Sequence, residues 1–408
     1  MKLILTWLLA VTACAPAAHP PLPPAAGAVR PGVEVFLEAP PASLRGKRIG
    51  LITNQTGVDR AGTSTIDRLV ASSQLRLVAL FGPEHGLRGT AAPGEKVASG
   101  TDARTGLPIH SLYGETRSPT PQTLRGIDAL VFDIQDIGAR PYTYVYTMAL
   151  SMQAAAEAEI PFIVLDRPNP IGGTIVEGNL LEPDFATFVG MYPIPVRHGM
   201  TAGELARFFN QEFGIGADLT VVPAEGWTRH TWFDATGLPW IPPSPNIPRL
   251  ESAVHYPGTV FFEGTNLSAG RGTSHPFAQV GAPWLRAEEV VREMEAHRLP
   301  GVRFAAVEFM PVNPGDEKFA DTPVRGVRLV MTDGESYRPV STSLLLLETI
   351  LRLHPAELEW IPRHFDRLAG TDRLRKAIQG GTLLTLLESW ARDARAFEEA
   401  RRPYLLYR

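Results

Sequence analysis

Four apolar runs that alternate with helix-like segments constrain the fold of this chain most strongly. The runs cover residues 47–53, 75–81, 127–133 and 160–166. Near-continuous apolar runs are typical of strands that are buried on both faces of a sheet. Helical spacing between the first two runs, and an Ala- and Met-rich segment between the last two, supply the connections. This alternation predicts an α/β fold built on a parallel sheet with right-handed crossovers.

Polar residues follow the carboxyl end of each of these four strands. In open parallel sheets, ligands bind in the crevice beyond the carboxyl ends of the strands. Solvated loops are polar too, but carboxylates, amides and guanidinium groups that converge favour a cleft for a polar ligand. In chain order, the candidates are Asn54, then Glu84 and His85, then Asp133, Gln135, Asp136, Arg140 and Tyr142, and finally Asp166, Arg167 and Asn169.

The loop Gly82-Pro-Glu-His-Gly-Leu-Arg-Gly89 stands out among these strand ends. Pro83 cannot continue a hydrogen-bonded ladder, and the glycines allow the backbone to turn sharply. We therefore expect Glu84 to project from a loop just beyond the second strand. Taken alone, the loop could be an ordinary surface turn, but the other three strand ends favour a role in catalysis.

Several familiar chemistries lack their sequence motifs. The chain has neither Gly-x-Gly-x-x-Gly after the first strand nor a P-loop, so we expect no nucleotide cofactor. No Gly-x-Ser-x-Gly elbow supports a serine hydrolase. The ten histidines show no metal-binding spacing, so we expect no metal and assign His85 and His198 to hydrogen bonds with a substrate. A net charge of −4 without any basic run argues against nucleic acid as a partner.

The N-terminus resembles an export signal that ends in a bacterial lipobox. Met1-Lys2 precede an apolar stretch that is too short to cross a bilayer, and small residues lead to Cys14. Cys14 is the only cysteine, which supports acylation there, although a cleaved signal with a chance cysteine is the alternative. We expect a signal peptide at 1–14, a Pro/Ala-rich tether at 15–32 and a lipid anchor in the cell envelope, facing the periplasm from the outer membrane in a Gram-negative host.

The remaining ~375 residues exceed the usual size of one core, so we expect two domains, 33–250 and 251–408. A proline-dense segment, 240–248, crosses between them and contains Asn246. The Gly-rich stretch 256–273 contains Glu263, Asn266 and Arg271, and its composition suits a substrate-binding loop or a hinge equally. Helices expected at 286–297 and 341–353, two apolar runs and a helical tail indicate a smaller α/β domain.

Four motifs in this order resemble the exo-β-N-acetylmuramidase family of peptidoglycan-recycling glycosidases. They are Gly82–Gly89, Phe132–Tyr144, Asp166–Pro170 and Glu263–Thr273, and the likeness extends from about Gly50 to the C-terminus. The resemblance implies a Rossmann-like N-terminal domain without a nucleotide, a smaller C-terminal domain and a cleft between them. It also implies removal of N-acetylmuramic acid from the non-reducing end of wall fragments, with Glu84 as the catalytic carboxylate.

Glycoside cleavage requires a carboxylic acid that protonates the leaving oxygen and usually a second carboxylate. With Glu84 as the acid, the second group is Asp133, Asp136 or Glu263, unless the 2-acetamido group of the sugar takes that part. The lactyl carboxylate of muramic acid suits a guanidinium, for which Arg140, Arg167 and Arg271 are candidates. Each of these arginines could instead pair with a neighbouring carboxylate.

Two other functions fit the same sequence features. A lipoprotein that captures sugars or muropeptides in a cleft, without any reaction, also has two domains around a ligand. An amidase or esterase would release peptide or acetate but no free sugar. In each of these interpretations the partners are a peptidoglycan-derived molecule and, through the lipid, the membrane.

Overall fold

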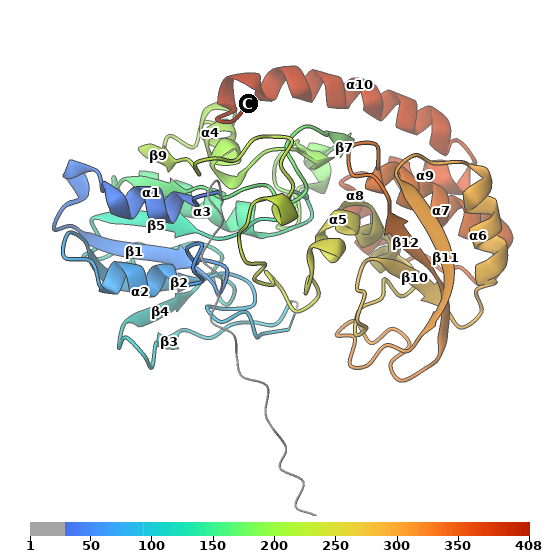
Figure 1. The fold of residues 1–408 in the computed structure, drawn as a ribbon, viewed down its shortest axis with the longest axis horizontal. Coiled ribbons are helices and arrows are strands. Elements are labelled where there is room, and N and C mark those ends of the chain that lie inside the picture. Colours follow the sequence, from blue (N-terminus) through green and yellow to red (C-terminus); the bar gives the residue numbers. More distant parts are fainter. Residues whose placement is uncertain (1–28, 93) are drawn as a thin grey trace, which may run out of the picture.

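The computed structural model describes residues 29–92 and 94–408 and shows two α/β halves (Figure 1). The predicted signal peptide, Cys14 and residues 15–28 of the predicted tether lie outside the described residues. Residues 29–32, which we assigned to the tether, belong to the folded body. Val29 is buried against Ala224 and Trp227, and Gly32 begins helix α1 (Gly32–Glu38). Because Val29 packs within the domain, the folded body begins before residue 33, where we predicted its start.

A seven-stranded sheet forms the N-terminal half, with the order β3-β4-β2-β1-β5-β6-β9. All neighbours pair in parallel except the edge strand β3. The strands are β1 (Arg48–Thr53), β2 (Arg76–Gly82), β3 (Gly100–Thr101), β4 (Pro108–Ser111), β5 (Ala129–Asp133), β6 (Phe162–Leu165) and β9 (Leu219–Val222). The six parallel strands have the order of a doubly wound Rossmann sheet, which confirms the predicted fold class. The four predicted strands are its centre.

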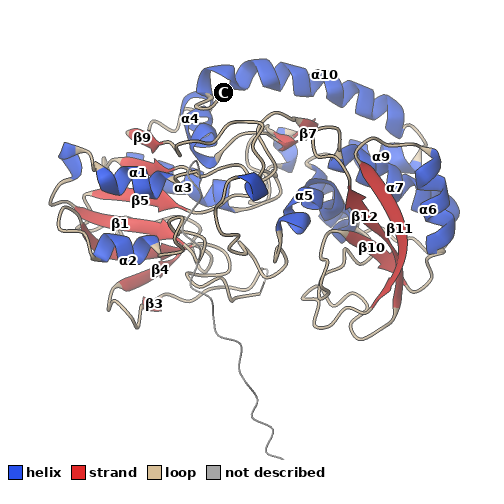
Figure 2. Cartoon of the chain, viewed as in Figure 1, coloured by secondary structure: helices blue, strands red, loops and turns tan. Residues whose placement is uncertain are grey.

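Helices cover both faces of this sheet, as the alternating connections require (Figure 2). Ile49 and Leu51 pack with α1 and α2 (Thr65–Val70) on one face. Ile52, one residue further on, belongs to the core on the other face, with α3 (Tyr144–Glu157) and α4 (Ala202–Glu212). Thr201 and Glu204 form the capping box that opens α4.

The C-terminal half contains a three-stranded antiparallel sheet, ordered β10-β12-β11, and several helices. The elements are α5 (Leu250–Thr259), β10 (Gln279–Ala282), α6 (Ala287–Ala296), β11 (Val302–Phe309), β12 (Val324–Met331), α7 (Pro339–Leu353), α8 (Pro362–Ala369), α9 (Arg373–Gln379) and α10 (Leu383–Arg401). We expected a loop from residue 256, but Tyr256 lies in α5 and a 3-10 helix follows at Val260–Gly264. Tyr256, Val260 and Phe261 are buried in the core, so packing outweighs the local glycine and proline signals.

Besides the proline-dense segment 240–248, a helix and a hairpin also join the two halves. Helix α10 runs from the C-terminal half to the N-terminal half (Figure 1). A hairpin, β7 (Glu177–Leu180) with β8 (Pro195–Arg197), packs beneath it, and Glu177 accepts hydrogen bonds from the first backbone amides of α7. One hydrophobic cluster extends through both halves. Within the part of the chain that the structure describes, no helix is both long and apolar enough to cross a membrane.

Candidate active site

A cavity of about 370 Å³ lies between the two halves, within the ~300–1,000 Å³ that small-molecule sites usually occupy. Loops beyond β2, β4 and β5 form one side of its wall, and α5, α8 and the loop before β10 form the other. The wall is rich in aromatic rings. Its members are Glu84, His85, Gly94, Tyr113, Arg117, Pro141, Tyr142, Thr143, Tyr144, Thr187, Phe188, Val189, Ser244, Asn246, Ile247, Tyr256, Glu263, Arg271, Phe277, His364, Arg367 and Leu368.

Glu84 lies two residues beyond the end of β2, as the sequence predicts. One carboxylate oxygen, Oε1, accepts a hydrogen bond from the Gly94 N–H at 3.0 Å. The other, Oε2, accepts one from the Thr143 hydroxyl at 2.7 Å, and Thr143 immediately precedes α3. The Glu84 carboxylate is therefore held at the wall by two elements that follow different strands of the sheet.

The Glu84 loop requires glycine at position 89. Its φ is +70°, and a Cβ atom at this position would lie 2.2 Å from the Gln55 side chain. Gln55 in turn donates to the carbonyl of Pro242 at 2.8 Å, and the Tyr144 hydroxyl donates to that of Pro243 at 2.6 Å. The Glu84 loop, the end of β1 and the proline-dense crossing segment are thus packed together beside the cavity.

His85 adopts a left-handed backbone conformation, with φ at +67°, next to the proposed acid. Its Nδ1 lies 2.8 Å from the carbonyl oxygen of Ala91 and must donate to it, because a carbonyl only accepts. Burial lowers the pKa of His85, which favours the neutral ring. The remaining nitrogen, Nε2, is then a hydrogen-bond acceptor at the cavity wall.

Glu263 is the second carboxylate of the wall. Its Oε1 accepts hydrogen bonds from Nε of Arg271 at 2.7 Å and from Nη2 of the same guanidinium. The Lys318 ammonium donates to the backbone carbonyl of Glu263 at 3.0 Å and thereby helps to fix this segment. The structure therefore places Glu263 and Arg271 together at the cavity as an ion pair.

Three tyrosines form the floor between the two carboxylates. The ring of Tyr142 meets those of Tyr144 and Tyr256 edge to face, at centroid distances of 5.0 and 5.8 Å. Tyr144 and Tyr256 donate their hydroxyls to backbone carbonyls, whereas the buried hydroxyl of Tyr142 has no partner within residues 29–92 and 94–408. Burial raises the pKa of Tyr142 well above its usual value, so this hydroxyl stays neutral.

Asp133 and Arg167, two predicted site residues, pair with each other away from the cavity wall. Asp133 is fully buried, and its oxygens accept from Nε and Nη2 of Arg167 at 2.5 and 2.9 Å. Arg167 also donates to the Val58 carbonyl at 2.7 Å. These residues occupy the strand ends next to the β1/β5 switch point, where dinucleotides bind in Rossmann folds. The ion pair gives both side chains a structural partner there.

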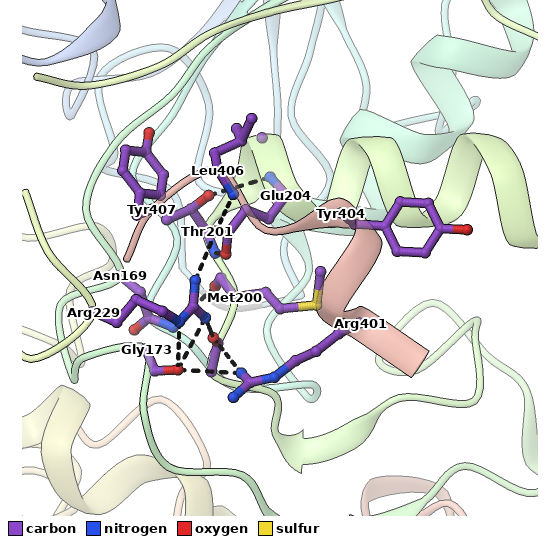
Figure 3. A network of polar contacts seen from close by, with 12 residues as sticks. Asn169, Gly173, Met200, Thr201, Glu204, Arg229, Arg401, Tyr404, Leu406 and Tyr407 are labelled. Atoms are coloured by element: carbon purple, nitrogen blue, oxygen red, sulfur yellow. Dashed lines mark hydrogen bonds and ion pairs between the residues drawn. The ribbon is translucent and has the colours of Figure 1, made fainter. Parts of the chain in front are cut away.

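The strand end of β6 is covered by the C-terminal residues of the chain (Figure 3). Asp166 accepts hydrogen bonds from the hydroxyls of Thr201 and Tyr407 at 2.7 and 2.6 Å and from the Gly203 N–H at 2.8 Å. Arg401 donates to the His198 carbonyl at 3.0 Å. Three predicted substrate-binding residues, Asp166, Asn169 and His198, are therefore absent from the cavity wall, because this covering excludes them.

Arg140 is also fully buried and bonded to the protein. It donates to the carbonyls of Asn179 and Ala369 at 2.8 and 2.5 Å, and so connects the hairpin to the end of α8. The other predicted side chains outside the wall, Asn54, Gln135 and Asn266, bond nearby backbone groups instead.

Asp136 lies buried behind the tyrosine floor and not in the wall itself. Its Oδ2 accepts from the Gly138 N–H at 2.7 Å and lies 3.7 Å from Nε2 of His198, while Oδ1 has no partner in the described chain. Burial raises the pKa of Asp136 to about 7. This group therefore carries a proton at mildly acid pH, inside the protein.

The cavity wall combines six predicted residues with others that the sequence analysis missed. The predicted ones are Glu84, His85, Tyr142, Asn246, Glu263 and Arg271. Thr143, Tyr113, Arg117 and Phe188 were missed. The signal for Tyr113 and Arg117 was weak, because they follow the four-residue, partly exposed strand β4, which ends at the same edge of the sheet. Among residues 29–92 and 94–408, no group of three or more His, Cys, Asp or Glu side chains is arranged to hold a metal ion.

Comparison with known proteins gives matches along almost the whole described chain. Family models described as the N-terminal and C-terminal parts of the exo-beta-N-acetylmuramidase NamZ match residues 49–251 and 254–407. A peptidoglycan beta-N-acetylmuramidase NamZ from Bacillus subtilis is 47% identical over 381 residues, which cover 93% of this chain and 91% of the relative. Crystal structures of two DUF1343 family proteins from Bacteroides fragilis match with TM-scores of 0.87 and 0.75, at 37% and 34% identity. Each match covers 93% of this chain and 99% of the other.

Proposed function

This chain belongs to the exo-beta-N-acetylmuramidase NamZ family, and on that premise we propose that it releases N-acetylmuramic acid from the non-reducing end of peptidoglycan fragments. Its 47% identity to a peptidoglycan beta-N-acetylmuramidase makes it a glycoside hydrolase that acts on a peptidoglycan-derived saccharide. The observation that carries the finer proposal is the position of Glu84, a carboxylate at a strand end that faces an aromatic-lined cavity between the two halves.

In this proposal Glu84 is the general acid and base. It protonates the glycosidic oxygen as the bond breaks and later removes a proton from the attacking water. The hydroxyl of Thr143 can donate to the ionised carboxylate or accept from the protonated form. Thr143 therefore supports the same position of Glu84 in both stages of the reaction.

The geometry of the cavity reduces the number of candidates for the second reacting group. Of the three carboxylates that the sequence suggests, Glu263 belongs to the wall, while Asp133 and Asp136 do not. The 2-acetamido group of the sugar is the other candidate, and the free hydroxyl of Tyr142 suits an acetamido oxygen. A Glu263→Ala variant distinguishes the two, since only a direct role predicts rescue of the reaction by azide in the space that the side chain leaves.

The direct test uses protein without residues 1–26 and a disaccharide of N-acetylmuramic acid linked to N-acetylglucosamine. We expect the wild type to release both sugars, and Glu84→Gln to do so about 100- to 10,000-fold more slowly. Glu115→Gln is the matched control, because Glu115 is exposed and absent from the cavity wall. Tight binding of the disaccharide without turnover would favour the sugar-binding lipoprotein, and release of peptide or acetate alone would favour an amidase or esterase.

We also propose that Cys14 carries a lipid that anchors the enzyme in the cell envelope, at the periplasmic face of the outer membrane in a Gram-negative host. The support is the sequence pattern: a short apolar segment and small residues lead to the only cysteine. Radiolabelled palmitate should enter the wild type and be absent from Cys14→Ala. Equal labelling of both proteins would exclude acylation at this residue.

A further inference from the structure

Arg117 is a cation of the cavity wall that lies against two aromatic rings. Its Cζ atom is 4.2 Å from the ring centroid of Tyr113 and 4.1 Å from that of Phe188. The two rings come from separate loops, after β4 and after β7. Such packing restricts the side chain and removes water from part of the guanidinium, while its N–H groups stay free to bind an anion.

Arg117 also differs from the other arginines in its electrostatic surroundings. No carboxylate within the described residues pairs with it. Arg271, by contrast, directs both Nε and Nη2 to Glu263, so one bidentate edge is occupied and its charge is already paired. Arg117 and Arg367 are both exposed, but no aromatic ring packs against the Arg367 guanidinium among the described residues, and its Nη2 lies 2.7 Å from Nδ1 of His364. Arg117 is therefore the aromatic-supported guanidinium of the wall whose charge is available.

Arg117 and Glu84 both interact with Tyr113 in the cavity wall. Tyr113 lies between them: its ring contacts Arg117, and the nearby Glu84, together with burial, raises the pKa of its hydroxyl. The acid and the cation thus flank a single tyrosine side chain. In N-acetylmuramic acid, the lactyl ether at C3 and the glycosidic bond at C1 are on the same sugar ring, so a site for this sugar needs an acid and a cation in the same part of the cavity.

We propose that Arg117 binds the lactyl carboxylate of N-acetylmuramic acid and thereby determines the preference for muramic acid over N-acetylglucosamine. This inference rests on the proposed function and replaces the arginines that the sequence suggested. A planar guanidinium binds a carboxylate through two parallel N–H···O bonds, which gives both affinity and orientation. Orientation of the lactyl group fixes the ring, and with it the glycosidic oxygen, relative to Glu84.

The test compares three disaccharides that share N-acetylglucosamine as the leaving group. Their terminal sugar is N-acetylmuramic acid, the same sugar with its lactyl carboxylate converted to a methylamide, or N-acetylglucosamine. For Arg117→Gln we expect kcat/KM on the free acid to fall roughly 10- to 100-fold, mainly through KM, and kcat/KM on the amide to change less than about twofold. Arg117→Lys should keep part of the preference, and Arg125→Gln, an exposed arginine outside the wall, should change nothing.

Two results would overturn the inference. An equal loss on the acid and the amide would mean that Arg117 only packs the loop, and an unchanged preference in Arg117→Gln would mean that another cation binds the lactyl group. The carboxylate could also belong to a stem peptide, so a fragment with a dipeptide on the lactyl group is included. A loss confined to that fragment would contradict the assignment.

A binding experiment separates this inference from the proposed function. Calorimetric titration with free N-acetylmuramic acid and with its lactyl methylamide needs no turnover. The inference predicts tighter binding of the acid by the wild type and equal, weaker binding of both by Arg117→Gln. If the wild type hydrolyses none of the disaccharides but shows this pattern, the proposed reaction fails and the carboxylate site stands. Equal binding of both sugars by the wild type, or binding of neither, rejects the carboxylate site.

Discussion

The ends of β2 and β6 each carry a carboxylate next to a proline-containing loop, but the two carboxylates lie in different surroundings. Glu84 lies just beyond β2, and Asp166 lies just beyond β6. Glu84 accepts two hydrogen bonds and lines a cavity, whereas Asp166 is fully buried beneath three donors. The position at a strand end is therefore shared by a proposed catalytic group and a structural group.

The difference comes from the segment that each strand end meets in the folded chain. The Glu84 loop faces the other half of the molecule, and the aromatic residues there leave a cavity. At the β6 end, the C-terminal residues return to the N-terminal half, where Arg401, Leu406 and Arg229 bond to the groups around Thr201 and Glu204 (Figure 3). The comparison teaches that a carboxylate at a strand end acquires its role from what covers it.

The largest expected effect on stability is at the covered carboxylate. Asp166→Ala leaves the hydroxyls of Thr201 and Tyr407 and the Gly203 N–H without their acceptor, so we expect a loss of about 2–4 kcal/mol in the free energy of unfolding. Urea denaturation at pH 5 measures this loss. Glu84→Ala should cost less than about 1 kcal/mol, because its donors face a solvated cavity. Equal losses in the two variants would remove the distinction between the strand ends.

Buried carboxylates also predict how stability depends on pH. Burial raises the pKa of Asp136 to about 7 and that of Asp166 to about 6, both above the usual value of about 4. Since the folded state holds these protons more tightly, their contribution is complete below about pH 4 and is lost as the pH rises to 7. Between pH 4 and 7.5, we expect the free energy of unfolding to fall by about 2 kcal/mol less in Asp136→Asn than in the wild type. A wild type that gains stability over this range, with Asp136→Asn unchanged, would contradict the prediction.

Tyr407→Phe tests whether the C-terminal segment stabilises the buried Asp166. The variant removes the hydroxyl that donates to Asp166 at 2.6 Å and should cost about 1.5 kcal/mol by thermal or urea unfolding. Tyr404→Phe is a control in the same segment, because the Tyr404 hydroxyl bonds to the exposed Glu212 and should cost less than about 0.5 kcal/mol. Indistinguishable stabilities of these two variants would show that the C-terminal segment does not seal Asp166.

The smallest effect on stability is expected at Thr143, beside the open strand end. Thr143→Val removes the hydroxyl bond to Glu84 but keeps the volume of the side chain, so we expect kcat to fall about fivefold with little change in stability. Thr147→Val, one turn further along α3, is the control, because the Thr147 hydroxyl has no partner in the described structure. A loss of stability without a loss of rate in Thr143→Val would make Thr143 a packing residue only.

The strands and the Glu84 loop were predictable because their signals are local. Apolar runs gave the central strands, and Pro83 with its neighbouring glycines marked the turn that exposes Glu84. The capping box at Thr201 and Glu204 was predictable for the same reason, because both of its partners lie within one helical turn.

The covering of other strand ends was not predictable, because it depends on distant residues. Tyr407 reaches Asp166 from 241 positions further along the chain, and nothing in the sequence near Asp166 indicates this contact. Arg117 was missed for a different reason: strand β4 is only four residues long and partly exposed, so its apolar pattern is weak. Polar residues at the four strand ends therefore gave a list of candidates, and only the packing of the folded chain separates catalytic candidates from structural residues.

The most direct test of this account measures the rate per folded molecule for three isosteric variants, Glu84→Gln, Asp133→Asn and Asp166→Asn, on the muramic acid disaccharide. The account predicts that Glu84→Gln loses about 100- to 10,000-fold in kcat and keeps the wild-type unfolding midpoint. Asp133→Asn and Asp166→Asn should unfold more easily but retain kcat within about threefold once corrected for the folded fraction. A comparable loss of kcat in either aspartate variant, or wild-type kcat in Glu84→Gln, would contradict the assignment of catalysis to the open strand end.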